Sequence, residues 1–120
     1  MIIGIGCDIC QISRFKDNYE KLAKRLLTEN EYAIYSDFTS EKRKIEFLAG
    51  RFSAKEAVVK ALDVPKLVKD IEILNDENGK PYCILEGYKI HISISHETEY
   101  SCAYALCESL DEGQKNHLNC

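Results

Sequence analysis

The sequence has no apolar run that approaches 18 residues, and it does not open with a basic segment followed by an apolar one. A membrane-spanning helix needs about 20 apolar residues, so we expect neither a membrane span nor a secretory signal. No repeat, low-complexity segment or linker divides the 120 residues, which predicts a single domain over residues 1–120. So short a chain has little room for a deep site of its own, which favours ligand sites between subunits.

The sequence also lacks the glycine-rich motifs that bind nucleotides. Gly4 and Gly6 begin a dinucleotide fingerprint, but G-x-G-x-x-G requires a third glycine where Ile9 stands, and no P-loop is present. The net charge of −4 gives no support to non-specific nucleic-acid binding, so we expect no nucleic-acid partner.

The six cysteines do not form a zinc motif. Cys7 and Cys10 make one C-x-x-C pair, but no second pair and no nearby pair of histidines completes it. Without a secretory signal, disulfides are not expected either. We therefore expect free thiols in a reducing cytoplasm, most of them packed as small apolar side chains.

A composition of 45% hydrophobic and 30% charged residues is that of an ordinary globular protein, but the charge is uneven. Residues 10–27 carry five bases against two acids. This segment is either a solvated helix face or a strip that docks an acidic partner, since rim charges steer association. The bases are Arg14, Lys16, Lys21, Lys24 and Arg25.

Helix signals fill the first half of the chain after a strand at residues 1–9. The pattern predicts a helix over 13–27. Thr28 and Glu31 have the spacing of a capping box that opens a short helix to about Phe38. Ser40 then caps a longer helix that ends at about Leu62.

The second half of the chain changes to the two-residue period of strands. Asn78-Gly79 predicts a hairpin between strands at 69–74 and 80–85, and residues 89–95 and 100–106 form a second pair. A polar tail follows from about residue 109. The order predicts an α+β fold in which the N-terminal strand and the helices pack on an antiparallel sheet.

Asp8 is anomalous in an apolar, β-prone run. Alternation places Gly4, Gly6 and Asp8 on one face of the strand and Ile3, Ile5, Cys7 and Ile9 on the other. The bare glycines let another backbone or a ligand approach the carboxylate closely. A carboxylate that loses hydration there needs a partner.

Glu56 is the second anomaly, because it falls in the apolar stripe of the long helix, which is formed by Ile45, Leu48, Ala49, Phe52 and Val59. Glu56 can pair with Lys60 one turn on, and Asp8 can accept bonds from a loop or helix end. Alternatively, the two carboxylates converge, in which case a cation must lie between them. Two oxygen ligands suit Mg²⁺, which fills its other positions with water and substrate phosphates. The residues alone lead to a candidate Mg²⁺–phosphate site.

These stretches resemble the holo-acyl-carrier-protein synthase family of 4′-phosphopantetheinyl transferases. GIGCDICQISRF is similar to the motif G-I-G-x-D-I-x-x-I-x-R-F/I, and FLAGRFSAKEAVVKAL to F-x-A-x-R-F-A-A-K-E-A-x-x-K-A. NGKPY and ISISHETEYSCAYAL match the later N-G-K-P and S-I-S-H elements. The resemblance covers residues 1–107 in order.

The resemblance implies an enzyme of fatty acid biosynthesis that transfers 4′-phosphopantetheine from coenzyme A to a serine of apo acyl carrier protein, releasing adenosine 3′,5′-bisphosphate. It also implies Mg²⁺ and a homotrimer with active sites between subunits. Asp8 and Glu56 match the metal ligands, and Lys60 would stabilise charge on the phosphoryl oxygens. The base for the carrier serine stays open between Glu56 and a metal-bound water.

The resemblance further implies contacts to coenzyme A and to the carrier. Arg51 and Lys55 are either contacts to coenzyme A phosphates or solvated charges. His96 by itself fits a structural hydrogen-bonding residue, whereas the resemblance implies that it contacts coenzyme A, with Ser95 as a second candidate for such a contact. Arg14 and Arg25 match docking residues for the acidic carrier. Relatives carry a glycine-rich segment where this chain has ALDVPKLVKDIEIL, so no contact to the adenine end is assigned.

Two other functions use the same residues. A Mg²⁺-dependent nucleotide pyrophosphohydrolase would employ the carboxylates without a carrier protein. A non-enzymatic trimeric binding module would use Asp8 and Glu56 in structural ion pairs.

Overall fold

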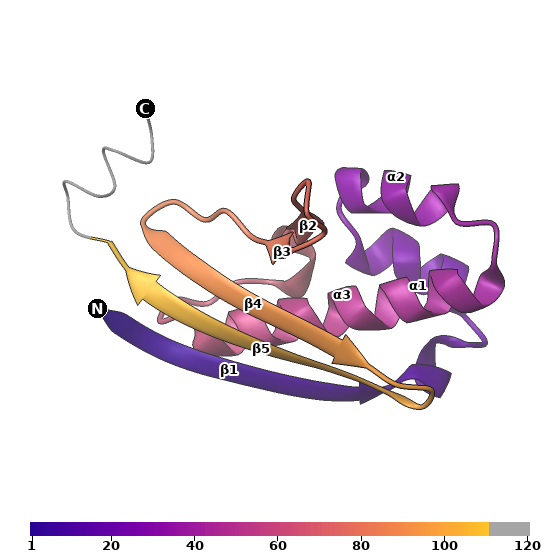
Figure 1. Cartoon of the computed structure of the whole chain (residues 1–120), viewed down its shortest axis with the longest axis horizontal. Coiled ribbons are helices and arrows are strands. Elements are labelled where there is room, and N and C mark those ends of the chain that lie inside the picture. Colours follow the sequence, from indigo (N-terminus) through magenta and orange to yellow (C-terminus); the bar gives the residue numbers. More distant parts are fainter. Residues whose placement is uncertain (111–120) are drawn as a thin grey trace.

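A computed structural model describes residues 1–110 of the chain. Its elements are β1 (Ile2–Gln11), η1 (Ile12–Phe15), α1 (Tyr19–Leu26), α2 (Glu29–Asp37), α3 (Glu41–Ala61), η2 (Val68–Asp70), β2 (Leu74–Asn75), β3 (Pro81–Tyr82), β4 (Tyr88–His96) and β5 (Tyr100–Ser109). The long strands form an antiparallel sheet in the order β1-β5-β4, and α3 runs along one face of it, while α1 and α2 gather beside the N-terminal half of α3 (Figure 1). The expected α+β fold is confirmed. The expected polar tail lies almost wholly outside the described residues.

The two predicted helix caps are present, but the first helix was predicted too long. Thr28 and Glu31 form the capping box of α2, and Ser40 accepts a bond from the amide of Arg43 at the start of α3. In place of a helix over 13–27, the chain makes the 3-10 turn η1 and starts α1 only at residue 19. The physical reason is that Ile12 and Phe15 are both buried, and a three-residue spacing fits the tighter 3-10 repeat.

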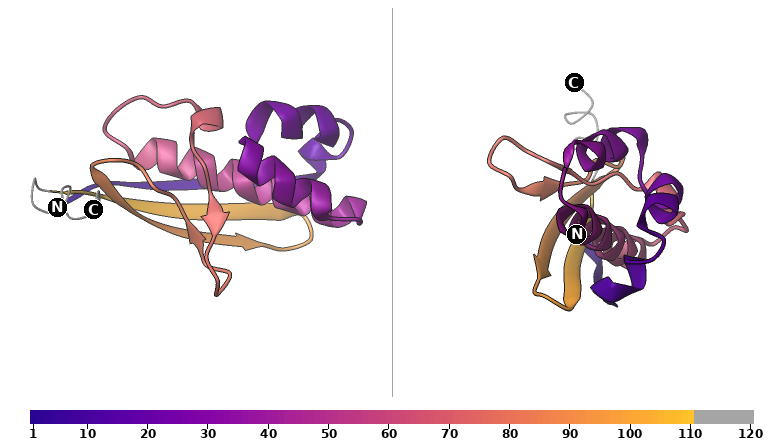
Figure 2. Two further views of the ribbon diagram at one scale, coloured as in Figure 1. Left: turned by 90° about the horizontal axis from the view of Figure 1, so that it is seen from above. Right: turned by 90° about the vertical axis from the view of Figure 1, so that its right-hand side faces the viewer.

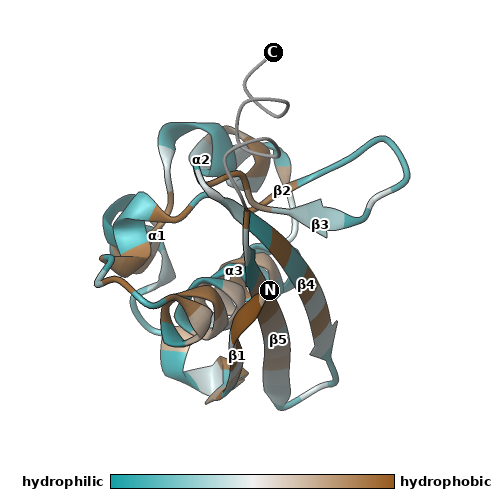
Figure 3. Cartoon of the chain, turned by 90° about the vertical axis from the view of Figure 1, so that its left-hand side faces the viewer, coloured by the Kyte–Doolittle hydropathy of each residue, from teal (hydrophilic) through white to brown (hydrophobic). Residues whose placement is uncertain are grey.

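The predicted hairpin at Asn78-Gly79 is confirmed, with Gly79 at φ +82°, but its strands are only two residues long. Pro81 has no amide hydrogen for a longer ladder. Ile71 and Ile73 are fully buried against the core although no strand pairs with them. The hydrophilic tip of the hairpin projects from the body of the molecule (Figure 3).

Strand β1 and helix α3 meet backbone to backbone. A Cβ on Gly4 would overlap the carbonyl of Ala61, and a Cβ on Gly6 would overlap that of Ala57. The backbone that we expected to approach the glycine face is therefore that of α3. A register shift between Ile2 and Gly4 turns Ile3 toward the core, so the predicted place of Ile3 on the opposite face is wrong.

The face of the sheet turned away from α3 carries apolar side chains that residues 1–110 leave exposed. Ile5 is 67% exposed and Ile9 64% exposed on β1, and Tyr104 lies exposed on neighbouring β5. Figure 2 shows α3 on one side of the sheet and no helix on the other. Among residues 1–110, no helix is long and apolar enough to cross a membrane.

Candidate functional site

Asp8 lies at the level of Glu56 where β1 crosses α3. Gly6 contacts the turn of α3 at Ala57, and the Cys10 Sγ lies 3.1 Å from the Ser53 Oγ. Asp8 stands between Gly6 and Cys10 on the same face of the strand, so it faces the stretch of helix between Ser53 and Ala57. Glu56 belongs to that stretch. The contact between strand and helix therefore brings together two carboxylates that are 48 positions apart in the sequence.

Lys60 completes this group. Its Nζ donates to Oδ1 of Asp8 and to the carbonyl of Cys7, each at 3.1 Å. Side chains of a helix point toward its N-terminus, so Lys60 extends back past the turn that carries Glu56. The sequence also allowed an ion pair between Glu56 and Lys60. This pair is not formed, because Lys60 pairs with Asp8.

The two carboxylates have oxygen atoms to spare. Oδ2 of Asp8 is buried and has no hydrogen-bond partner among the described residues, and only 14% of the whole side chain is exposed. Glu56 is half-buried, and within residues 1–110 it makes no ion pair. An orphaned, nearly buried carboxylate oxygen is costly unless something binds it.

This donor set fits Mg²⁺. No group of three or more His, Cys, Asp or Glu side chains that could hold a metal ion occurs in the described part of the chain. Magnesium takes one or two carboxylates and keeps water or substrate phosphate in its other positions. Asp8 and Glu56 offer that number of oxygen ligands.

A second polar cluster surrounds a cavity of about 160 Å³ between α3 and the end of β4. Arg51 and His96, both expected at coenzyme A, line this cavity. Ser95 is exposed next to His96 but does not line the cavity. The other lining residues are Phe38, Arg43, Glu46, Phe47, Gly50 and Ile94.

Arg51 is a buried cation that pairs with no carboxylate among residues 1–110. Its guanidinium stacks 4.5 Å from the centre of the Phe47 ring, and its Nη2 donates a hydrogen bond to Oδ1 of Asn75. Its Nε is buried and has no partner among the described residues. Burial lowers the pKa of Arg51, and the negative field of Glu31 opposes that effect. Such a group favours an anion in the adjacent cavity.

Arg43 lies in the same cavity, 5.0 Å from the centre of the Phe38 ring, and sequence reasoning missed it. It falls in the first turn of α3, outside the motifs that carry the family resemblance, and no spacing signal singles it out among the neighbouring bases.

Lys55 does not occupy either of its predicted environments. Its side chain is fully buried, and its Nζ lies 2.5 Å from Oε1 of Glu31 and donates to the carbonyl of Leu26 at 2.6 Å. Burial lowers the pKa of Lys55, and the bond to Glu31 raises it. Lys55 is thus not a solvated charge, and its fully buried ammonium, which binds Leu26 and Glu31 inside the fold, is not exposed to a coenzyme A phosphate.

The two clusters lie on opposite sides of α3. Lys60 follows Arg51 by nine positions, which at 3.6 residues per turn is half a turn out of phase. Asp8 is on the edge strand β1, whereas His96 is on the other edge strand, β4. One chain therefore does not bring its Asp8 cluster and its Arg51 cluster to a single ligand.

The bases expected at a docking strip are exposed. Arg14 lies on η1, and Arg25 lies in the last turn of α1. The remaining bases of the strip, Lys16, Lys21 and Lys24, are exposed too.

The sequence is similar to proteins of known family. Residues 4–105 match the 4′-phosphopantetheinyl transferase superfamily. A holo-[acyl-carrier-protein] synthase of Staphylococcus saprophyticus is 49% identical over 115 residues, covering 90% of this chain and 99% of that relative.

Solved structures of holo-[acyl-carrier-protein] synthases also superpose on this chain. A holo-(acyl-carrier-protein) synthase from Bacillus anthracis str. Ames in complex with CoA (3′,5′-ADP) superposes with a TM-score of 0.85 at 40% identity, over 92% of this chain and 99% of that one. A Helicobacter pylori holo-[acyl-carrier-protein] synthase in complex with coenzyme A gives a TM-score of 0.72 at 27% identity, over 87% of this chain and 99% of that one.

Proposed function

This chain belongs to the 4′-phosphopantetheinyl transferase superfamily, and we propose that it transfers the 4′-phosphopantetheine group of coenzyme A to a serine of an apo acyl carrier protein. The phosphoanhydride bond of coenzyme A breaks, the serine oxygen takes the phosphoryl group, and adenosine 3′,5′-bisphosphate leaves. The observation that carries this proposal is the orphaned Oδ2 of Asp8 at the level of Glu56, with Lys60 beside it. The relative names and the coenzyme A complexes support the substrate class.

In this proposal Asp8 and Glu56 hold Mg²⁺, which when bound neutralises the charge of the pyrophosphate. Lys60 reaches the same point and donates to the phosphoryl oxygens as negative charge develops on them. Glu56 is half-buried and forms no ion pair with the described residues, so it also serves as a candidate acceptor for the proton of the carrier serine.

We also propose that the working form is a homotrimer with sites between subunits. Asp8, Glu56 and Lys60 of one subunit then face Arg51, Arg43 and His96 of the next, which joins two clusters that a single chain keeps apart. The apolar sheet face around Ile5 and Ile9 provides a contact surface of the kind that marks subunit interfaces. The exposed bases Arg14 and Arg25 are placed to attract the acidic carrier.

The proposed setting is the cytoplasm, where the reaction supplies holo carrier for fatty acid biosynthesis. The five cysteines in the described residues are free thiols, as expected for a reducing compartment. We take the chain to act as one domain.

The direct test is mass spectrometry of apo acyl carrier protein incubated with this protein, coenzyme A and Mg²⁺. We expect the carrier to gain one phosphopantetheine group on a serine, and the gain to disappear with EDTA or with Asp8→Asn. A pyrophosphohydrolase would instead cleave coenzyme A without any carrier, and a binding module would leave both reactants unchanged. Either result would refute the proposal.

A further inference from the structure

Arg51 and Lys55 are four residues apart on α3 and point to the same side of the helix. Both are buried cations, and the carboxylate of Glu31 raises the pKa of each. Only Lys55 pairs with that carboxylate. One buried carboxylate therefore lies near two buried cations but forms an ion pair with only one of them.

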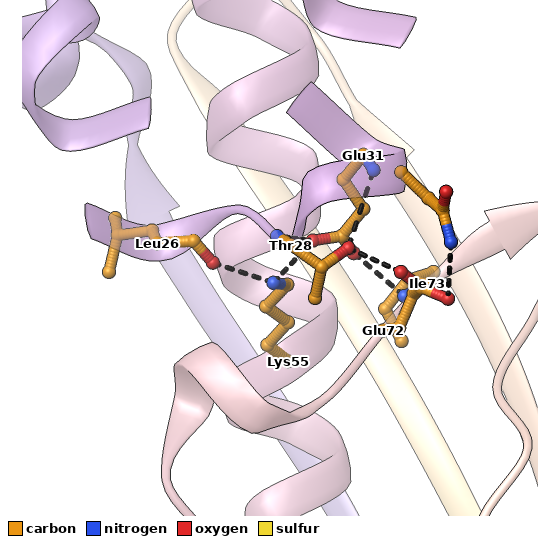
Figure 4. A network of polar contacts seen from close by, with 7 residues as sticks. Leu26, Thr28, Glu31, Lys55, Glu72 and Ile73 are labelled. Atoms are coloured by element: carbon orange, nitrogen blue, oxygen red, sulfur yellow. Dashed lines mark hydrogen bonds and ion pairs between the residues drawn. The ribbon is translucent and has the colours of Figure 1, made fainter. Parts of the chain in front are cut away.

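The carboxylate of Glu31 is held in an orientation in which Lys55 is the cation that it pairs with. Its Oε1 accepts from the amide of Thr28 at 2.8 Å and from Lys55, and its Oε2 accepts from the amide of Ile73 at 2.7 Å (Figure 4). The carboxylate is fully buried, so no water relieves its charge. Three donors fix its direction, and none of them is Arg51.

Arg51 is held by a neutral group instead. Asn75 accepts from its Nη2 and donates through Nδ2 to the carbonyl of Gly79 at 2.9 Å, which fixes the orientation of the amide. Asn75 lies two residues after Ile73, the residue whose amide binds Glu31. The same extended segment thus carries the support for Glu31 and the support for Arg51.

We propose that Glu31 and Lys55 are positioning residues that keep Arg51 without a carboxylate partner, so that its positive charge remains available for a phosphate group of coenzyme A. This inference rests on the proposed function, since it assumes that the cavity of Arg51 takes a phosphate. Lys55 acts by occupying Glu31, and it does not touch the ligand.

The physical argument is competition between counter-ions. If Lys55 loses its charge, Glu31 stays in place because two backbone amides still bind it, and its negative field then acts on Arg51 without opposition. In a poorly solvated interior that field is weakly screened, so the carboxylate competes with the incoming phosphate for the guanidinium. Removal of both charges removes the competitor.

The test is calorimetric binding of adenosine 3′,5′-bisphosphate and of coenzyme A to the full chain. Lys55→Met should weaken binding of both about tenfold, the value of one charge-assisted hydrogen bond, and should raise the KM for coenzyme A with little change in kcat. The double variant Glu31→Gln with Lys55→Met should bind as tightly as the wild type. Lys44→Met is the matched control, because Lys44 is also on α3 but pairs with Glu20 of α1 at 3.5 Å, and this variant should bind both ligands as tightly as the wild type.

A second variant covers the case in which Lys55→Met does not fold. Asn75→Asp leaves Lys55 and Glu31 intact but gives Arg51 a carboxylate at an exposed position, and it should also weaken binding about tenfold. Wild-type affinity in Asn75→Asp, or failure of the double variant to recover affinity lost in Lys55→Met, would overturn the inference. Absence of binding by the wild-type protein would instead refute the proposed function itself.

Discussion

The ammonium of Lys60 lies 3.1 Å from one oxygen of Asp8, and the other oxygen of Asp8 is buried without a partner. Lys60 thus binds one of the two oxygens of a carboxylate that is almost completely buried. Together with the half-buried Glu56, the group carries two negative charges against one positive charge. That balance attracts a divalent cation, and the exposed part of the Lys60 side chain leaves its ammonium able to meet a phosphate.

Replacement of Glu56 by glutamine tests the metal site. The side chain keeps its size but loses its charge, so we expect Glu56→Gln to fold normally and to lose Mg²⁺-dependent transfer by at least about 100-fold. Turnover and circular dichroism measure the two effects. Glu77→Gln, at the exposed tip of the hairpin, is the control and should transfer at the wild-type rate. Normal turnover by Glu56→Gln would show that this carboxylate has no part in the reaction.

The backbone contact between β1 and α3 predicts opposite effects for two glycines. Gly6→Ala would drive a methyl group into the carbonyl of Ala57, and because the backbone would have to shift to make room, we expect a loss of about 3 kcal/mol of stability. A Cβ on Gly50 would meet the Ile94 side chain at 3.6 Å and the Ser101 Oγ at 3.9 Å, both ordinary contacts, so Gly50→Ala should gain up to about 1 kcal/mol from helix propensity. Thermal unfolding of both variants measures this difference. A Gly6→Ala protein as stable as the wild type would contradict the packing described.

The uncovered sheet face predicts how assembly depends on Ile5. A glutamate there faces solvent in the single chain but would be buried between subunits, so Ile5→Glu should fold and sediment as a smaller species than the wild type. Sedimentation velocity gives the masses. Ile84→Glu is the matched control, because Ile84 is 83% exposed and lies in the loop after β3 and not on a strand of the sheet. A wild-type protein that is monomeric at all concentrations would disprove the trimer.

Charge reversal at Arg14 tests carrier docking. Arg14 is exposed on η1 among other bases, so Arg14→Glu should raise the KM for the acyl carrier protein several-fold and leave the KM for coenzyme A unchanged. The effect should shrink as salt is added, since exposed charges are screened over about 10 Å at 0.1 M ionic strength. Steady-state kinetics with each substrate varied in turn distinguishes the two constants. Equal changes in both would argue against a docking role.

Local patterns determined much of what the sequence predicted. The caps at Thr28 and Ser40 and the turn at Gly79 depend on neighbours within a few residues, so their residue types suffice to identify them. Asp8 and Glu56 stood out for a related reason: a charge in an apolar pattern is visible without coordinates. The family motifs then connected them.

Only the tertiary structure decided how charges far apart in the sequence are shared. Lys55 and Lys60 belong to one motif, yet Lys55 is buried on Glu31 while Lys60 reaches Asp8. The side of α3 that meets α2 buries its lysine, and the side that meets β1 does not. Gly4 and Gly6 determine which side meets β1, because they let the helix backbone lie directly against the strand. Helical periodicity assigns residues to faces, but it carries no information about what each face will contact, because that depends on how the whole chain packs.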